Sequence, residues 1–285
     1  MRAFAKGIQA AGLPAGPGDA APVSEADLAR LPGVAQRYLH AMGVVGQPRA
    51  WSFRARYTGW LRLRPAGPRM PMQVWQYNNG LSPARLLRMR LRLAGVLPMT
   101  GWDTYLHGRG RMHGKLLGLV SVANGNGPRF DVSELVSWLN DAVLFAPSML
   151  LNSATTWTAT STDDTFDVAV TDAGHRVQAR VTLDADGRPR RFSTTDRWAA
   201  LPEGLVRAQW LTPVIGWQVA DGRPVPTGGD AIWQLPDRPF HYAHIDIPTD
   251  GIDYNITPGD AGLQAKTSHV RSSTARVPEE GDEGS

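Results

Sequence analysis

Alternation of apolar and polar residues, which recurs from Trp51 to about residue 255, constrains the fold of this chain more than any other feature. Its cleanest example is a run in which apolar residues alternate with arginines: Leu87, Met89, Leu91 and Leu93 with Arg88, Arg90 and Arg92. Successive side chains of a strand point to opposite faces, so such a run buries one face of a sheet. We therefore expect most of this chain to be strand.

The strands are expected to follow one another as a meander, without the strand–helix–strand rhythm of a parallel sheet. After residue 154 the expected strands are 155–161, 164–171, 175–183, 188–197, 206–219, 228–235 and 240–255. Asp172-Ala173-Gly174 is typical of a hairpin turn between two of them. The pattern predicts a mainly β (α+β) fold, in which a large antiparallel sheet curls around its helices.

Two segments have helical spacing instead. The first spans about 24–43, with Ser24 as its N-cap and with Pro32 dividing it into a short turn and a longer helix. The second is expected to begin near Asp131, in a capping box with Glu134, and to end at Pro147. This second helix is expected to lie across the sheet.

Length and composition indicate one domain with two weak ends. The chain has 285 residues, and residues 24–257 fit a single large β domain. Residues 1–23 are rich in Gly, Ala and Pro and are interpreted as a flexible leader. Residues 258–285 lack aromatic side chains and end in EEGDEGS, so we expect a disordered acidic tail.

Several classes of function are disfavoured by what the sequence lacks. There are no cysteines, no run of 18 apolar residues and no GxxxxGK[ST], GxSxG or HExxH motif. The nearest approach to a metal motif lies at 241–246, where only His244 and Asp246 share a strand face. We therefore expect no metal, no cofactor, no integral membrane contact and a cytoplasmic location, whereas the oligomeric state stays open.

The stretch 101–113 carries the candidate catalytic residues. Asp103, Tyr105 and His107 project from one face of the expected strand at successive i+2 positions. A carboxylate that orients an imidazole beside a phenol could serve in acid–base catalysis. The alternative is that this row faces water and continues the charged outer face of the sheet.

Aromatic and acidic side chains supply the candidate ligand-binding residues. The chain has ten tryptophans, and a curled sheet that its helices do not fill would leave an aromatic-lined cavity. The candidates comprise three strand residues and three residues on one face of the second helix: Trp75, Tyr77, Trp102, Glu134, Trp138 and Asp141. Alternatively, the tryptophans fill a core and the two acids pair with arginines of the sheet.

Blocks at both ends of the expected domain resemble those of a bacterial family of unknown function. The first begins at 31–39 with Leu-Pro-x-x-x-Gln-Arg-Tyr-Leu, and Trp138-Leu139-x-Asp141 belongs to the second helix. The last is Asp-Gly-x-x-Val-Pro-Thr at 221–227, followed by the blocks at 231–236 and 252–255. The resemblance covers about 31–256. It implies a LolA-like fold, a half-barrel with helices on its concave side, and a pocket for an apolar ligand.

Three functions remain as hypotheses. The first is binding of a hydrophobic or amphipathic small molecule in the cavity. The second is a cofactor-independent isomerase or cyclase that uses Asp103, Tyr105 and His107 in the same cavity, as would suit a biosynthetic pathway. The third is nucleic-acid binding through the arginine-bearing face, which we disfavour because no aromatic side chains are interleaved there as stacking platforms.

Overall fold

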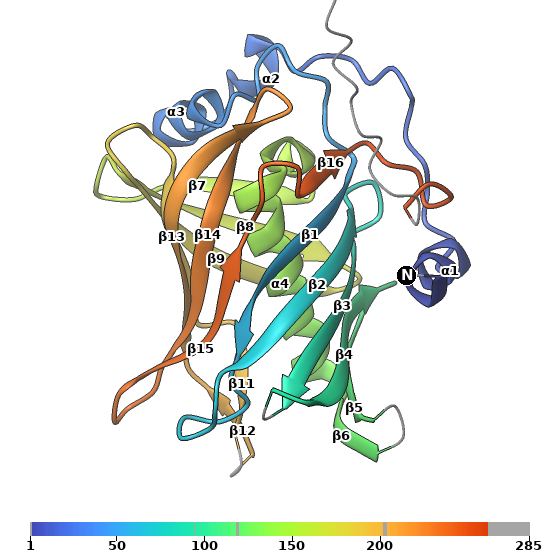
Figure 1. Cartoon of the computed structure of the whole chain (residues 1–285). Coiled ribbons are helices and arrows are strands. Elements are labelled where there is room, and N and C mark those ends of the chain that lie inside the picture. The colour runs from blue at the N-terminus through green and yellow to red at the C-terminus, as the bar shows by residue number, and fades with distance from the viewer. Residues whose placement is uncertain (1, 94, 118–119, 202–203, 262–285) are drawn as a thin grey trace, which may run out of the picture.

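The fold is a single antiparallel sheet that curves around one long helix (Figure 1). The computed structural model describes residues 2–93, 95–117, 120–201 and 204–261. The sheet has 14 strands, and helix α4 (Pro128–Phe145) lies on its concave side. The prediction of a mainly β fold with a large curved antiparallel sheet is confirmed, and of the helices expected on the concave side the long helix α4 lies there.

The sheet consists of two meanders. The first runs outward from the middle of the sheet through β1 (Ser52–Leu61), β2 (Met70–Asn79), β3 (Ala84–Leu93), β4 (Leu97–Leu106), β5 (Arg109–Leu116) and β6 (Val120–Gly125). The second returns from the other edge through β7 (Thr155–Ala159), β8 (Thr165–Asp172), β9 (His175–Leu183), β10 (Pro189–Thr194), β13 (Gln209–Ala220), β14 (Arg223–Gln234) and β15 (Pro239–Asp246). Strand β1 pairs with β15 in the middle of the sheet, in the register Thr58↔Asp246.

Three short strands complete the β structure. Strand β16 (Ile252–Tyr254) pairs with the first residues of β1. Strands β11 (Trp198–Leu201) and β12 (Gly204–Arg207) form a separate two-stranded sheet, which the sequence analysis missed. This hairpin lies at the end of the molecule opposite α2 (Glu25–Leu28) and α3 (Gly33–Ala41) (Figure 1).

Helix α4 is buried along almost its whole length because the sheet surrounds it. Residues 133–145 are all buried, and the 3₁₀ helix η1 (Pro147–Leu150) follows. The helix begins at Pro128, so the prediction that Asp131 caps it is wrong. Asp131 instead accepts a hydrogen bond of 2.7 Å from the backbone N–H of Gly110 on β5. A side chain at Gly110 would collide with the carbonyl of Phe130, so glycine is needed where the helix meets the sheet.

Helix α1 (Arg2–Ala10) covers part of the convex face, where the sequence analysis expected an irregular leader. Phe4 and Ile8 are buried in a cluster with Tyr77 and Leu86 from the sheet. Two apolar residues one helical turn apart thus fix this helix to the sheet. The residues of the expected tail up to 261 are also ordered against the domain, and those from 262 lie outside the described residues.

The helical segment before β1 is divided as predicted. Helix α2 begins after Ser24, which forms a capping box with Asp27, and α3 begins after Pro32. Tyr38 of α3 is buried and its hydroxyl donates a hydrogen bond of 2.7 Å to the carbonyl of Val143. Through this bond α3 closes the end of the half-barrel where α4 ends.

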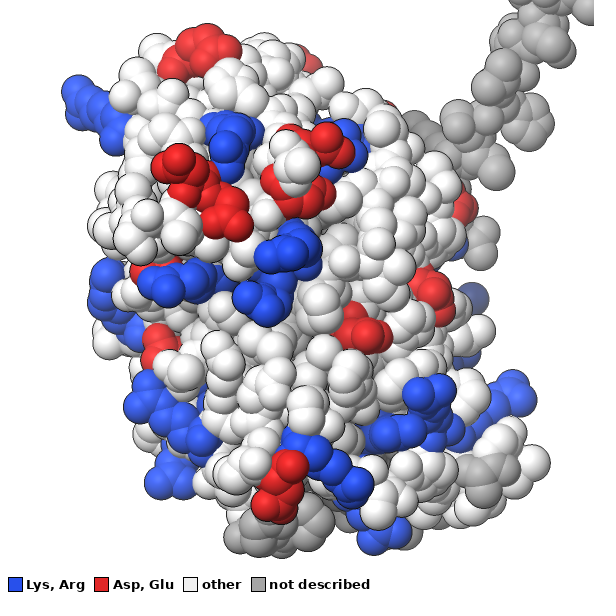
Figure 2. Space-filling view, turned by 90° about the vertical axis from the view of Figure 1, so that its left-hand side faces the viewer, with Lys and Arg blue, Asp and Glu red and all other residues white. Residues whose placement is uncertain are grey.

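The outer surface carries charges of both signs. Figure 2 shows one side of the molecule, on which Lys and Arg side chains are interspersed with Asp and Glu rather than joined in one continuous patch. No helix among the described residues is long and apolar enough to cross a membrane.

Candidate functional site

A cavity of about 540 Å³ lies between α4 and the concave face of the sheet. Strands of both meanders and the β11–β12 hairpin line it. The apolar part of the lining is rich in methionine and aromatic side chains: Met72, Met89, Met99, Met112, Phe130, Trp198, Trp210, Trp233 and Phe240. Helix α4 therefore does not completely fill the concave side of the sheet.

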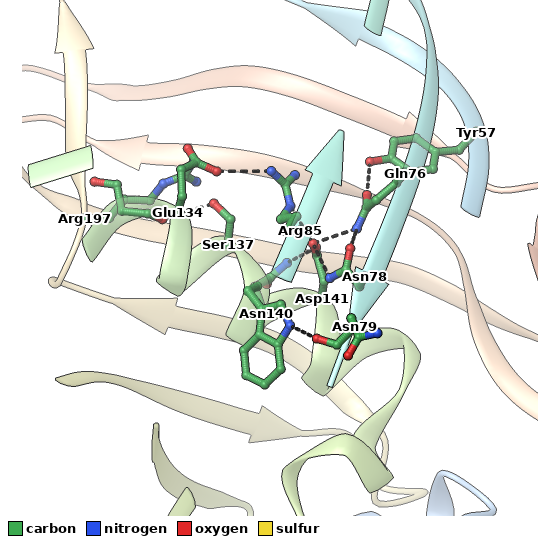
Figure 3. Close-up of polar contacts among 12 residues, drawn as sticks. Tyr57, Gln76, Asn78, Asn79, Arg85, Glu134, Ser137, Asn140, Asp141 and Arg197 are labelled. Carbon is green, nitrogen blue, oxygen red and sulfur yellow. Dashed lines mark hydrogen bonds and ion pairs between the residues drawn. The ribbon is translucent and has the colours of Figure 1, made fainter. Parts of the chain in front are cut away.

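A buried ion-pair network forms the polar floor of this cavity (Figure 3). Arg85 of β3 donates from Nε to Oδ2 of Asp141 at 2.7 Å and from Nη1 to Oε2 of Glu134 at 3.1 Å. All three residues are at most 8% exposed. Asp141 and Glu134 lie two helical turns apart on α4, so one guanidinium connects the helix to the sheet.

Asp141 is the better satisfied of the two helix carboxylates. Its Oδ2 also accepts a hydrogen bond of 2.7 Å from Nε2 of Gln76 and one of 3.4 Å from Nδ2 of Asn78. Gln76 in turn accepts from the hydroxyl of Tyr57 at 2.7 Å. Asp141 is therefore held by hydrogen bonds from Arg85, Gln76 and Asn78.

Glu134 is held less tightly and faces another carboxylate. Apart from Arg85, its nearest cation is Arg197, whose Nη2 lies 4.0 Å from Oε1. Burial and the neighbouring carboxylate of Asp103 raise the pKa of Glu134 to about 7, against the lowering effect of the two guanidiniums. Burial likewise raises the pKa of Asp103, while Arg85 and Arg197 lower it. Two nearby carboxyl groups whose pKa values are both raised favour a state with one proton between them.

Arg197 stands in a box of aromatic rings on the opposite wall. Its guanidinium carbon lies 4.1 Å from the ring centroid of Trp210 and 5.7 Å from that of Trp233. Its Nη1 donates to the hydroxyl of Tyr242 at 3.3 Å. Tryptophan faces attract cations, so this wall of the cavity stabilises positive charge.

The structure separates the three candidate catalytic residues. Asp103 lines the cavity, in agreement with the alternative in which its strand face points inward rather than to water. Tyr105 shares that face, but it is fully buried and donates a hydrogen bond of 2.6 Å to Asp172. His107 lies in the two-residue turn between β4 and β5 with φ of 49°, and its Nε2 is 3.1 Å from the carbonyl oxygen of Ala11. Of the three predicted catalytic residues, Asp103 therefore lines the cavity, and Tyr105 and His107 do not.

Three of the aromatic candidates lie on the wrong side of the sheet for the cavity. Trp75, Tyr77 and Trp102 belong to the cluster under α1 on the convex face. Trp138 is fully buried in the core beside the cavity, where its indole Nε1 donates to the carbonyl of Asn79 at 2.9 Å. Of the six predicted ligand-binding residues, the structure places Glu134 and Asp141 on the cavity lining.

Arg85 and Arg197 are site residues that the sequence analysis missed. A signal for Arg85 was present, because it has the same strand parity as Leu87 and Met89, which the alternation assigns to the buried face. Arg197 was expected to be the last residue of strand 188–197, but β10 ends at Thr194, and Arg197 lies in the segment between β10 and β11. Within the described part of the chain, no group of three or more His, Asp or Glu side chains could hold a metal ion. The cavity offers a ligand two carboxyl groups of raised pKa, two guanidiniums and aromatic faces.

The raised pKa of Glu134 predicts a pH dependence of stability. Glu134 is protonated in both the folded and unfolded states below its ordinary pKa of 4.5, and its stabilising contribution is complete there. As the pH rises towards about 7, the unfolded state releases this proton before the folded state does, and the contribution is lost. The free energy of unfolding of the wild type, minus that of Glu134→Gln, should therefore fall across this window in urea titrations. The same difference for Asp250→Asn, whose side chain is 80% exposed and pairs with Arg56 rather than with a histidine, should stay level, and a level result for Glu134→Gln would contradict the assignment.

Comparison with known proteins gives a family and a set of similar structures. The model of a family described as "Family of unknown function (DUF6544)" matches residues 21–245. No curated protein matches the chain. A structure described as an outer membrane lipoprotein-sorting protein domain from Vibrio parahaemolyticus is similar at a TM-score of 0.42 and 10% identity, over 80% of this chain and 94% of that one.

Two further solved structures are similar over most of the chain. A LolA superfamily protein from Nitrosomonas europaea has a TM-score of 0.39 and 10% identity, over 77% of this chain and 93% of that one. A DUF1329 family protein from Desulfovibrio piger has a TM-score of 0.35 and 12% identity, over 81% of this chain and 97% of that one. These likenesses concern the general arrangement of sheet and helices.

Proposed function

This chain belongs to the DUF6544 family of unknown function, and from that premise we propose that it binds a hydrophobic or amphipathic small molecule in the cavity between α4 and the sheet. The observation that carries the proposal is the cavity itself. Its volume of about 540 Å³ falls in the range of small-molecule sites, and its wall is mostly apolar with a few convergent polar groups.

The composition of the wall supports an apolar ligand of adaptable shape. Four methionines contribute to it, and their unbranched, polarisable side chains repack around ligands of different shape at low cost. The aromatic rings of Trp198 and Trp233 offer large flat surfaces on the same wall. An apolar molecule would replace the water of the cavity and gain the hydrophobic contribution of its buried surface.

A larger side chain in the cavity should abolish this binding. Val214 of β13 lines the cavity, whereas Val219 of the same strand is 63% exposed. We expect Val214→Trp to weaken binding of the neutral fluorescent probe N-phenyl-1-naphthylamine by about tenfold or more, which corresponds to ~1.4 kcal/mol. Val219→Trp is the matched control and should bind the probe like the wild type. Equal binding by all three proteins would show that the probe, if it binds, binds elsewhere.

Acid–base catalysis in the same cavity is the second candidate. The neighbouring carboxyls of Asp103 and Glu134 favour it, because a shared proton supplies an acid and a base at once near neutral pH. Binding alone returns the ligand unchanged, whereas catalysis returns it altered. Native mass spectrometry of the protein purified from its own host, followed by identification of any released molecule before and after incubation, distinguishes the two.

A further inference from the structure

The charges that face the cavity do not balance. Asp103, Glu134 and Asp141 supply three carboxyl groups, against the two guanidiniums of Arg85 and Arg197. The remaining charged residues of the lining, Arg62 and Asp230, cancel each other. With all of these carboxylates and guanidiniums ionised and with His113, which also lines the cavity, neutral, the cavity carries one negative charge in excess.

The excess negative charge is assigned to Asp103, because the other carboxylates of the cavity have ion-pair partners. Arg85 is committed to Asp141 and Glu134, at 2.7 and 3.1 Å. Among the residues that the structure describes, the Asp103 carboxylate has neither a hydrogen bond nor an ion pair, although it faces the cavity. A buried carboxylate without a hydrogen bond or an ion pair is costly, and a ligand that supplied one would be held strongly.

The opposite wall shows that this cavity accommodates a cation. The guanidinium of Arg197 lies over Trp210 and Trp233 and close to the hydroxyl of Tyr242. Arg197 is 9% exposed, and its Nε has no hydrogen-bond partner among the described residues. Two polar groups of the cavity thus lack a hydrogen-bond partner among the described residues, the carboxylate of Asp103 and the Nε–H of Arg197.

We infer that the ligand is an amphipathic amine, whose ammonium group pairs with Asp103 and whose apolar body lies among the methionines and tryptophans. This rests on the proposed function and names the chemical class of its ligand. An ammonium group would neutralise the excess negative charge of the floor. An anionic head group would add to that charge, and a neutral one would leave Asp103 unpaired.

Three probes of equal chain length test the charge of the ligand. Decylamine, decan-1-ol and decanoate differ only in the head group, and their binding to the full chain can be measured by isothermal titration calorimetry. We expect decylamine to bind about tenfold tighter than decan-1-ol, which corresponds to ~1.4 kcal/mol, and decanoate to bind weakest. Asp103→Asn should bring decylamine to the affinity of decan-1-ol and leave decan-1-ol unchanged. Asp250→Asn is the matched control, because it also removes a carboxylate but from a side chain that is 80% exposed.

A pH comparison makes the same test without a substitution. The groups that face Asp103 and Glu134, or share their cavity, come from several elements: Arg85, Asp141, Arg197, Tyr57, Tyr242 and His113. One unit above the Glu134 pKa of about 7 the floor carries its excess charge, whereas one unit below it a proton already neutralises that charge. Because primary amines titrate near ~10.4, decylamine stays protonated throughout, and its affinity should fall at the lower pH while that of decan-1-ol does not.

Three other outcomes would contradict the amine or the binding function. If decan-1-ol binds and decylamine binds no tighter, the amine is rejected while the binding function stands. If decanoate binds tightest, the ligand is an anion and Arg197 is its partner. If none of the three probes binds, the proposed function itself fails.

Discussion

Arg85→Met should lower the free energy of unfolding by about 3–5 kcal/mol, because it leaves two buried carboxylates without their shared cation. The guanidinium of Arg85 is buried with Asp141 and Glu134 between α4 and the sheet. Burial alone would lower the pKa of Arg85, but Asp141 and Glu134 raise it, so the side chain is a permanent cation. Urea unfolding followed by circular dichroism measures the loss.

Two further variants show whether the loss of stability comes from the unpaired carboxylates of Glu134 and Asp141. Arg85→Met combined with Glu134→Gln and Asp141→Asn should recover much of the stability, since no carboxylate of α4 is then left unpaired. Arg56→Met removes a guanidinium from a pair with Asp250 that is exposed on both sides, and should cost less than ~1 kcal/mol. If Arg85→Met and Arg56→Met lowered the free energy of unfolding equally, burial of the Arg85 ion pairs would not explain the loss.

Trp138→Ala should destabilise the protein by about 3–5 kcal/mol, the range for removing a large buried aromatic side chain. Trp138 is fully buried on α4, and its indole N–H is bonded to the carbonyl of Asn79 at the end of β2. Trp138→Phe keeps most of the apolar volume and loses only this hydrogen bond, so a cost of ~1–2 kcal/mol is expected. Thermal and urea unfolding of the two variants should therefore give clearly different midpoints.

The same variants distinguish a core residue from a ligand-binding one. Trp138 was a candidate for ligand binding, and the structure places it beside the cavity rather than on its lining. Trp138→Phe should accordingly bind N-phenyl-1-naphthylamine with the affinity of the wild type. A large loss of affinity in this well-folded variant would return Trp138 to the binding site.

The strands of the fold were predictable because alternation is a local property. The parity of Leu87 and Leu91 against Arg88 is visible in the sequence and assigns the two faces of β3 correctly. Helix α1 was missed because its glycine- and proline-rich surroundings resemble a linker, and because only Phe4 and Ile8 anchor it. The binding of a terminal helix to a distant sheet face is a tertiary contact that local pattern does not encode.

The site was predictable only in part, for a related reason. Alternation shows which residues share a face, but it does not show which face is concave. Asp103 was therefore found with its orientation undecided, while Trp75 and Trp102 were placed at the cavity although they lie under α1. His107 could have been excluded beforehand, because a residue followed by glycine between two strands is typical of a tight turn. Arg197 and its aromatic box depend on segments that meet only in the folded sheet.

The pairing of β1 with β15 has a consequence for how the molecule is made. Each meander is built from contacts between neighbouring strands and can form as its part of the chain leaves the ribosome. The seam between them cannot close until residue 246 has been synthesised, and α4 is already complete by then. The cavity takes its wall from β3 and β4 on one side and from β13, β14 and β15 on the other. The cavity is therefore complete only after β15 has been added to the sheet.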